Sequence, residues 1–412
     1  MRGSGEQGTG RPPDWQALVL AGIAAWSVLA PYYPLRYGGA VALLLALTRM
    51  RWYRPGLSDA LAFAYFTLAA ASYFWADFPA DTFEAIKNQL GVLGLFVGIR
   101  AVGTARINLR VIGLGYLAGC YYSLLLLWQV RRQAAPVLER GINDYRYGIV
   151  GVNQNYTAYA LAVGAAVILL LWWSSGLRLR SLLNSGALLL VGVGLLAFGI
   201  SLTGTRGAML ALVLLVVWGV IYRIRPETAF NTLVITGVIT VILISSGLVD
   251  ELITPQSEAG RETGDLNGRL TIWPYARQSI SEHPLLGIGL GAFFRITPFQ
   301  MVAHNLVLEI GVGVGLIGLL LFGSLMYSAV IRDTRMIEDV RGRALAVGAL
   351  IAVTLPIYTS GHWEQSAAGW VVIALFSRSP LLMDTAEFKD DEVCVSPDAV
   401  SEPSRNRSDR SG

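Results

Sequence analysis

The segment that decides the fold is Asp250–Ala303, with the sequence DELITPQSEAGRETGDLNGRLTIWPYARQSISEHPLLGIGLGAFFRITPFQMVA. It is a long polar interruption in a chain that is otherwise largely apolar up to residue 382. It leads directly into His304, at the start of another apolar run. The segment carries four arginines: Arg261, Arg269, Arg277 and Arg295. We predict that it is a large loop bearing functional residues, and that the apolar segments around it form its scaffold.

Composition indicates a membrane protein. Of the 412 residues, 54% are hydrophobic and only 15% are charged, whereas soluble domains carry about 25% charged residues. The net charge of +4 comes almost entirely from arginine. In a membrane protein a basic total typically reflects positively charged cytoplasmic loops. We therefore expect membrane lipids as partners and no nucleic acid.

Apolar segments recur along the chain at lengths near the ~20 residues that a helix needs to cross a bilayer. They lie at about 15–30, 37–48, 57–76, 89–103, 109–130, 155–174, 182–203, 207–222, 229–249, 302–331, 343–360 and 366–382. This pattern predicts an all-α polytopic membrane protein with about 12 transmembrane helices, and with the 250–303 loop between helices 9 and 10. The transmembrane domain is expected to cover 15–382. The polar ends, 1–14 and 383–412, are expected to be disordered and cytoplasmic.

The distribution of arginine predicts the orientation. If the N-terminus is cytoplasmic, the short loops on that side hold most of the arginines, among them Arg100, Arg106 and Arg110. The loop expected at 75–88 is acidic and would lie outside. Two long outer loops are exceptions, because 131–154 and 250–303 are also rich in arginine. These arginines are either ordinary surface residues or ligands for an anion. Arg146, in the first of these loops, is a candidate for substrate binding.

Gly204-Thr205-Arg206-Gly207 forms a short turn between two apolar runs. One interpretation of Arg206 is an interfacial arginine that extends to the lipid headgroups. The functional interpretation is a guanidinium held by the turn and facing a phosphate, which its planar donors bind in pairs.

Leu270, Trp273, Ala276 and Ile280 recur at helical spacing. They predict an amphipathic helix on the membrane surface, with Asn267 as its cap and Pro274 in its first turn. Arg269 would stand at the start of this helix and is a candidate for function. Arg277 is a candidate both for headgroup contact and for substrate binding.

His304-Asn305 begins the tenth apolar segment, and Glu309 follows within it. An imidazole at this place can accept a proton near neutral pH, although a histidine that merely caps a helix is the structural alternative. His283 and His362 are interpreted as structural, and the three dispersed histidines show no zinc-site spacing.

Glycines suggest close packing and turns. Gly94-x-x-x-Gly98, Gly115-x-x-x-Gly119 and Gly311-x-x-x-Gly315 predict close approach of helices. Gly287-Ile288-Gly289-Leu290-Gly291 has the wrong spacing for a nucleotide loop and is expected to be a flexible turn. The chain has no D-x-D pair to hold a divalent metal, so we expect neither a metal nor a cofactor.

Taken in order, these motifs resemble the O-antigen ligase and polymerase superfamily of bacterial envelope glycosyltransferases, and most closely its ligase branch. The resemblance rests on Val152-Asn153-Gln154-Asn155, Gly204-Thr205-Arg206-Gly207, Gly268-Arg269 through Trp273, His283-Pro284-Leu285-Leu286-Gly287-Ile288-Gly289 and His304-Asn305-x-x-Leu308-Glu309. Each motif is short, and it is the ordered set that is specific.

The resemblance implies a GT-C-type helical fold in the bacterial inner membrane. It further implies transfer of a glycan from undecaprenyl diphosphate to a sugar hydroxyl, as of lipid A core, at the periplasmic face and without a metal. Arg206 and Arg269 would bind the diphosphate, and His304 would orient or deprotonate the acceptor. Asn305 and Glu309 are expected to bind substrate. A polymerase that extends a lipid-linked glycan, or a transporter of such a glycan, are the alternatives.

Overall fold

The computed structural model describes residues 14–29, 33–49, 53, 55–132, 147–149, 152–174, 187–224, 269–298, 303–337, 340–360, 366–377, 379 and 381. Within these ranges all regular structure is helical. Several expectations fall outside them: the chain ends at 1–13 and 382–412, the span at 229–249, and the residues Arg146, Arg261 and Asn267.

The helices follow the predicted apolar segments closely. They are α1 (Trp15–Leu29), α2 (Tyr33–Arg49), α3 (Leu57–Ala71), α4 (Pro79–Val102), α5 (Arg106–Arg132), α6 (Gln154–Ser174), α8 (Ala187–Thr203), α9 (Arg206–Ile224), α12 (Arg269–Glu282), α13 (Phe293–Ile296), α14 (Leu306–Tyr327), α15 (Val340–Ser360) and α16 (Ala367–Phe376). Five helical stretches in the described part are long and apolar enough to cross a membrane, and five further apolar helices are shorter. The predicted fold class, an all-α polytopic membrane protein, is confirmed.

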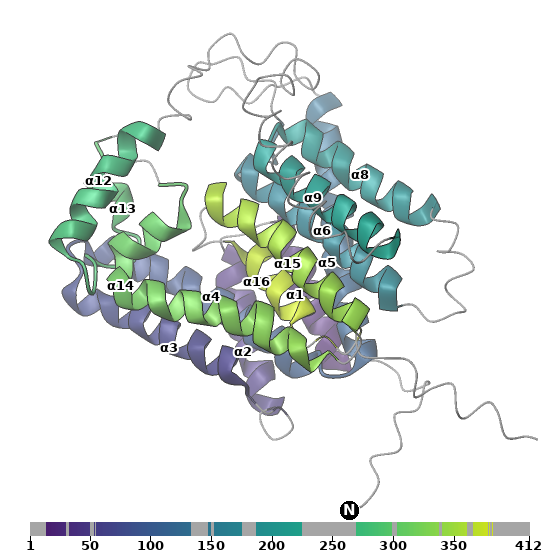
Figure 1. Ribbon diagram of the computed structural model, residues 1–412, viewed down its shortest axis with the longest axis horizontal. Coiled ribbons are helices and arrows are strands. Elements are labelled where there is room, and N and C mark those ends of the chain that lie inside the picture. Colours follow the sequence, from purple (N-terminus) through teal and green to yellow (C-terminus); the bar gives the residue numbers. More distant parts are fainter. Residues whose placement is uncertain are drawn as a thin grey trace, which may run out of the picture.

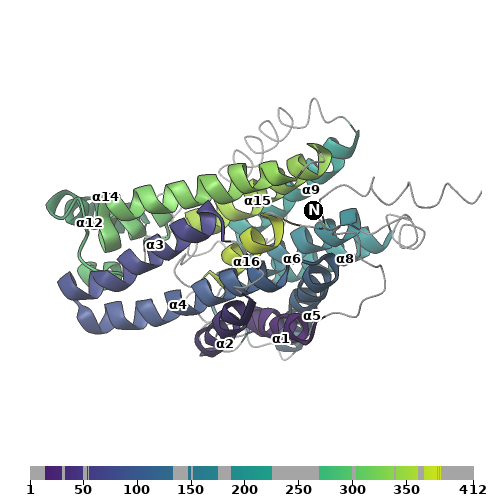
Figure 2. The same cartoon turned by 90° about the horizontal axis from the view of Figure 1, so that it is seen from below.

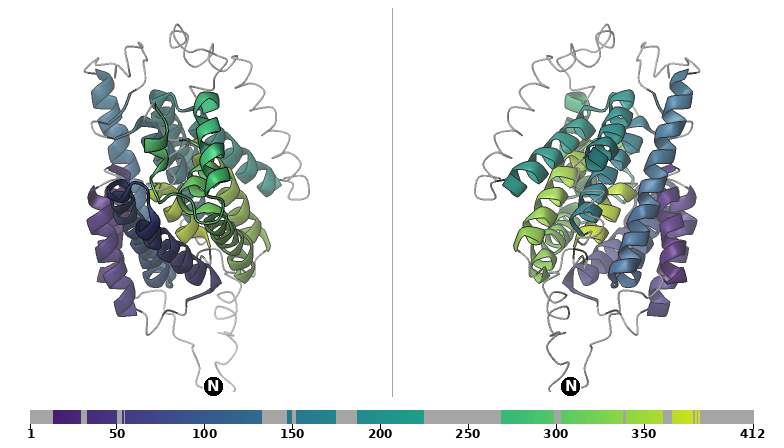
Figure 3. Two further views of the ribbon diagram at one scale, coloured as in Figure 1. Left: turned by 90° about the vertical axis from the view of Figure 1, so that its left-hand side faces the viewer. Right: turned by 90° about the vertical axis from the view of Figure 1, so that its right-hand side faces the viewer.

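The long helices α3, α4 and α14 run side by side, and α12 and α13 lie together at one end of them (Figures 1 and 2). We call this the α12 end of the bundle. α1 and α2 lie on the flank opposite to α14 and α15 (Figure 3). Helix α16 occupies the middle of the molecule, where all ten of its residues are buried. A helix that is apolar all round belongs in such a place.

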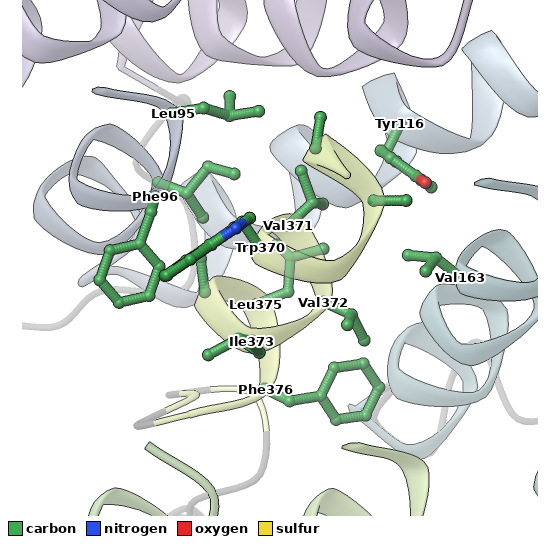
Figure 4. Close-up of a cluster of buried hydrophobic side chains, with 14 of the residues drawn as sticks. Leu95, Phe96, Tyr116, Val163, Trp370, Val371, Val372, Ile373, Leu375 and Phe376 are labelled. Carbon is green, nitrogen blue, oxygen red and sulfur yellow. The ribbon is translucent and has the colours of Figure 1, made fainter. Parts of the chain in front are cut away.

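Trp370 of α16 forms the centre of the core (Figure 4). Its ring lies 5.3 Å from that of Phe66, 5.5 Å from that of Phe96 and 6.2 Å from that of Phe322, measured between ring centroids. These three phenylalanines come from α3, α4 and α14. Because offset and edge-to-face aromatic contacts are favourable, this one side chain ties the three long helices to α16.

Two of the three glycine pairs bring helices into close contact, as predicted. A Cβ at Gly94 would overlap the backbone of Gly39, so α4 packs directly against α2. A Cβ at Gly115 would overlap the backbone of Ala21, which places α5 equally close to α1. Small residues permit this approach because no side chain separates the two backbones.

The third glycine pair behaves differently, because α14 is broken at Gly315. This residue has φ 65° and ψ −163° inside the helix. The N–H groups of Ile288 and Gly289 donate to the carbonyls of Val312 and Gly313, at 2.8 and 3.0 Å. Beyond the break, the N–H of Leu316 donates to the carbonyl of Pro284 at 2.8 Å. The segment 284–289 thus supplies the backbone partners that the interrupted helix has lost.

The glycine-rich segment is therefore a fixed part of the fold, and the expectation of a flexible turn was wrong. Gly287, Gly289 and Gly291 all have positive φ, at 65°, 106° and 76°, a conformation that glycine adopts without steric cost. Gly287–Leu290 are buried. Broken helices at membrane depth are tolerated only where other groups satisfy the freed backbone, and here the glycine-rich segment does so.

Gly315→Ala should strongly destabilise the protein. Its Cβ would meet the backbone of Leu285, and alanine is disfavoured at this φ. Overpacking and backbone strain together predict a loss of about 2–5 kcal/mol. Thermal unfolding of the purified protein in detergent measures the loss. Gly323→Ala is the matched control, since on the same helix a Cβ at Gly323 meets nothing within 4 Å. Equal stability of the two variants would contradict the importance of the break.

Helix α4 begins ten residues earlier than its apolar segment suggested. The 3₁₀ turn Ser72–Trp75 ends where the expected 75–88 loop begins, and most of that loop forms the first turns of α4, with Pro79 at the first helical position. Proline is favoured there because its missing N–H is not needed. The acidic residues Asp81 and Glu84 therefore stand on a helix.

Arg100 was expected in a cytoplasmic loop but lies buried in α4. Its guanidinium pairs with Asp59 of α3 at 2.8 Å and with Asp333 at 2.8 Å, and all three side chains are at most 3% exposed. Asp333 opens the 3₁₀ turn Asp333–Met336, which follows the π-helical turn Ser328–Arg332 at the end of α14. Burial raises the pKa of neighbouring Tyr53 to about 12, so its hydroxyl stays protonated beside Arg100. The arginine therefore joins α3, α4 and the end of α14.

Candidate active site

Arg206 is the first residue of α9, immediately after a tight turn. Gly204 adopts φ 62° in this turn, and α8 ends at Thr203. The hydroxyl of Thr205 donates to Oδ1 of Asn155 at 3.1 Å. Asn155 stands in the first turn of α6, so the two motifs around residues 155 and 205 meet in space. The backbone that presents Arg206, which is half-buried, is thus anchored on a second helix.

The helix predicted around Trp273 is α12, and it begins at Arg269 as expected. Pro274, however, lies in its interior and not in its first turn. The apolar face of α12 also differs from the expectation. Ile272 and Ala276 are fully buried, in a small second core with Ile288 and Val312. The helix therefore packs against protein, whereas an amphipathic helix on the membrane surface would leave this face to lipid.

Trp273 links α12 to the third motif. Its indole N–H donates to the carbonyl of Ala303 at 3.0 Å, directly before His304. Arg277 lies on the exposed side of α12, where it is free to meet solutes or headgroups. The structure therefore holds the helix that starts with Arg269 and the residue that precedes His304 in one unit.

His304 stands just before the N-cap of α14. The cap is Asn305, whose Oδ1 accepts from the N–H groups of Val307 and Leu308 at 3.0 and 3.4 Å. The histidine therefore does not cap the helix. The carboxylate of Glu309, 5% exposed, accepts from the backbone N–H of His304 at 3.1 Å. These three residues form one hydrogen-bonded group.

The backbone of His304 is strained. With φ 49° it is the one non-glycine residue in the described part of the chain with positive φ. For a residue with a Cβ this conformation costs about 1–2 kcal/mol. Such strain persists only where the surroundings enforce it, and it is often found at functional sites. The neighbouring contacts of Ala303, Asn305 and Glu309 provide this enforcement.

Other arginines of the polar loops have structural partners. Arg295 of α13 pairs with both carboxylate oxygens of Asp81, at 2.8 and 3.1 Å, and this contact raises the pKa of Arg295. Arg131 and Arg132 are the last residues of α5, and each guanidinium lies over the ring of Trp128. The Arg295 pair fastens the 269–303 segment to the start of α4.

Trp75 and Asp77 fasten the same segment at a second place. The indole N–H of Trp75 donates to the carbonyl of Leu286 at 3.1 Å. The backbone N–H of Asp77 donates to the carbonyl of Ile288 at 3.0 Å. Together with exposed His283 they line an open cavity of about 340 Å³. The described part of the predicted loop, residues 269–298, is therefore docked on the α3–α4 hairpin.

The hydrogen bonds link the candidate residues into two groups. One contains Asn155, Thr205 and the start of α9 with Arg206. The other contains α12, His304, Asn305 and Glu309. The side chain of Arg269 and all of Arg146 lie outside the described structure. Composition and motif order had pointed to the candidate residues of both groups. No sequence signal indicated that the hydrogen bond between Trp273 and Ala303 connects α12 to His304.

Fold and site together define a class: a polytopic all-α membrane protein with polar residues at the starts of α9, α12 and α14. Residues 191–323 match the family model described as O-antigen ligase. This part of the chain, which runs from α8 into α14, is therefore similar to that family, and the predicted resemblance to the superfamily is confirmed. The closer resemblance to its ligase branch stays a prediction. The match includes Arg206, Arg269, Arg277, His304, Asn305 and Glu309. No curated protein matches the chain.

Proposed function

We propose that the protein is an O-antigen ligase of GT-C type, which transfers a glycan from undecaprenyl diphosphate to a sugar hydroxyl of lipid A core. The observation that carries the proposal is the family match over residues 191–323, because it contains all three residues with predicted chemical roles. We place the reaction at the periplasmic face of the bacterial inner membrane.

The positions of the two arginines support binding of a diphosphate. Arg206 and Arg269 are each the first residue of a helix. A helix N-terminus presents unpaired N–H groups and the positive end of the helix dipole. A guanidinium at such an end adds paired, charge-assisted donors for phosphate oxygens. Both arginines would therefore stabilise the negative charge of the departing diphosphate.

An apolar cavity supports a lipid-linked donor. It measures about 660 Å³ and is lined by Tyr73, Phe74, Phe83 and Ile86, with Ala70, Pro79 and Ala80 completing it. It lies at the turn between α3 and α4, at the α12 end of the bundle. A polyprenyl chain would be shielded from water there by aromatic and aliphatic surface.

The proposed reaction is a single displacement. The acceptor hydroxyl oxygen forms a bond to the anomeric carbon of the donor, and the bond from that carbon to the diphosphate oxygen breaks. The hydroxyl proton passes to the imidazole of His304, and the undecaprenyl diphosphate leaves with its charge stabilised by Arg206 and Arg269. Attack from the face opposite the leaving group inverts the anomeric centre, and no step requires a metal.

The polymerase uses the same donor chemistry and differs only in its acceptor, a second lipid-linked glycan. The transporter alternative requires polar residues along a path through the membrane. The buried charges Arg100, Asp59 and Asp333 gather instead where α3 begins and α4 and α14 end. Their contacts with each other are those of a helix junction, which favours a transferase over a transporter.

The test is glycan transfer by the purified protein in detergent with EDTA present. We expect transfer from undecaprenyl-diphosphate-linked glycan to lipid A core at an undiminished rate, with an inverted linkage. Elongation of the donor without lipid A core would identify a polymerase. Dependence on an added divalent metal would contradict the mechanism, and movement of donor across proteoliposomes without transfer would identify a transporter.

A further inference from the structure

We propose that Glu309 is a positioning residue for His304, which acts by holding its backbone, and not the substrate ligand expected from the sequence. The inference rests on the proposed function, because it gives Glu309 a task in the same reaction. Its basis is the contact between the buried Glu309 carboxylate and the His304 backbone N–H.

The contact lies at two positions that control how a chain enters a helix. His304 directly precedes the N-cap Asn305, and Glu309 is the fourth residue of α14. In many helices these two positions carry apolar side chains that pack together and fix the entry angle of the chain. Here a hydrogen bond of 3.1 Å connects them instead. A directed bond to the backbone fixes the peptide plane, which an apolar contact leaves freer.

The peptide plane matters because the backbone of His304 is in a left-handed conformation. The direction of its imidazole depends on that backbone, since Cβ follows from φ and ψ. Three neighbours hold the segment: Trp273 binds the carbonyl of Ala303, Asn305 caps α14, and Glu309 binds the N–H of His304 itself. Glu309 is the one of the three whose side chain bonds to His304 directly.

A role in binding the donor fits Glu309 less well. Its side chain is buried and one oxygen is engaged with the backbone. Beside a diphosphate, a carboxylate would add like-charge repulsion. Burial and negative charge both suit Glu309 to the positioning role. Its carboxylate accepts a charge-assisted hydrogen bond from the His304 N–H in a place where little water is available to bind that N–H.

The experiment compares Glu309→Ala, Glu309→Gln and His304→Ala in the transfer assay, with donor binding measured separately. Glu309→Ala removes the acceptor, and we expect kcat to fall about 100-fold, the effect of a displacement of roughly 1 Å in a reacting group. The KM and the Kd for undecaprenyl-diphosphate glycan should stay within about two-fold. Glu309→Gln retains an oxygen at the same place and should recover most of the rate.

A second measurement does not depend on activity. With His283→Gln and His362→Gln, His304 is the one histidine left in the chain. Its imidazole signal in nitrogen-15 NMR should move in Glu309→Ala and return in Glu309→Gln. Thermal unfolding verifies that each variant is folded. If Glu309→Ala proves unfolded, Glu309→Gln is compared with Glu309→Leu, in which a side chain of similar size lacks the acceptor.

The outcomes separate the two proposals. If His304→Ala is inactive while Glu309→Ala retains full kcat, the positioning role is refuted and the proposed function stands. A raised Kd for the donor in Glu309→Ala with an unmoved His304 signal would restore substrate binding as the role of Glu309. If His304→Ala is fully active, the proposed chemistry fails, and the NMR signal alone then decides whether Glu309 holds His304.

Discussion

His304→Ala should abolish measurable glycan transfer and leave the protein folded. A side chain that accepts the proton of the attacking hydroxyl contributes about 10²–10⁴-fold to the rate. The structure gives no reason for a large loss of stability, because the side chains of Asn305 and Glu309 bond to backbone N–H groups that the variant keeps.

The measurement is the initial rate of transfer, normalised to folded protein from size-exclusion chromatography. His283→Ala is the matched control, since this histidine is exposed on the same polar segment and has no role in the proposed reaction. We expect its rate to stay near that of the wild type. Full activity of His304→Ala, or an equal loss in both variants, would exclude His304 as the base.

Arg100→Met should have the largest effect on stability, about 3–5 kcal/mol, because it leaves two buried carboxylates without their cation. The guanidinium contacts Asp59 and Asp333, and Ser58 and Ser377 donate or accept within the same cluster. Removing the arginine leaves Asp59 and Asp333 near each other in a place that water hardly reaches. Their mutual repulsion and desolvation should separate the ends of α3, α4 and α14.

Unfolding in detergent, followed by circular dichroism, measures this loss. Arg332→Met is the matched control, as Arg332 is exposed and adjacent to Asp333, and exposed substitutions typically stay within about 0.5 kcal/mol. The triple variant Arg100→Met, Asp59→Leu and Asp333→Leu should recover much of the stability, since replacing a whole buried ion cluster by apolar residues is often neutral. A single Arg100→Met with unchanged stability would refute the structural role of the cluster.

The helices were predictable where hydrophobicity alone decides them. Apolar runs located the described membrane helices, and most of their ends to within about five residues. Helix α12 followed from the spacing of its apolar side chains. The start of α4 was missed because its first turns are polar, so their helical structure depends on Pro79 and on packing against the 286–295 segment. Local sequence carries little information on such a contact.

The burial of Arg100 and the break in α14 could not be predicted from the sequence either, because both depend on contacts between distant parts of the chain. The partners of Arg100 lie 41 and 233 residues away, and only the assembled fold brings them together. Gly311-x-x-x-Gly315 is compatible with either helix packing or a break, and the surrounding residues are apolar in both cases. The break is favoured by the segment 284–289, whose backbone groups form hydrogen bonds with the residues of α14 on either side of Gly315.

The interrupted helix has a consequence for the order of events during biosynthesis. Each half of α14 is shorter than the ~20 residues that cross a bilayer, so the segment enters the membrane most readily as one continuous apolar helix. Residues 284–289 are synthesised earlier and must reach the same side before they can meet Val312 and Leu316. We expect the continuous helix to form first and to open at Gly315 only when that segment docks. The active site would then be completed after insertion, by an exchange of intrahelical for tertiary backbone bonds.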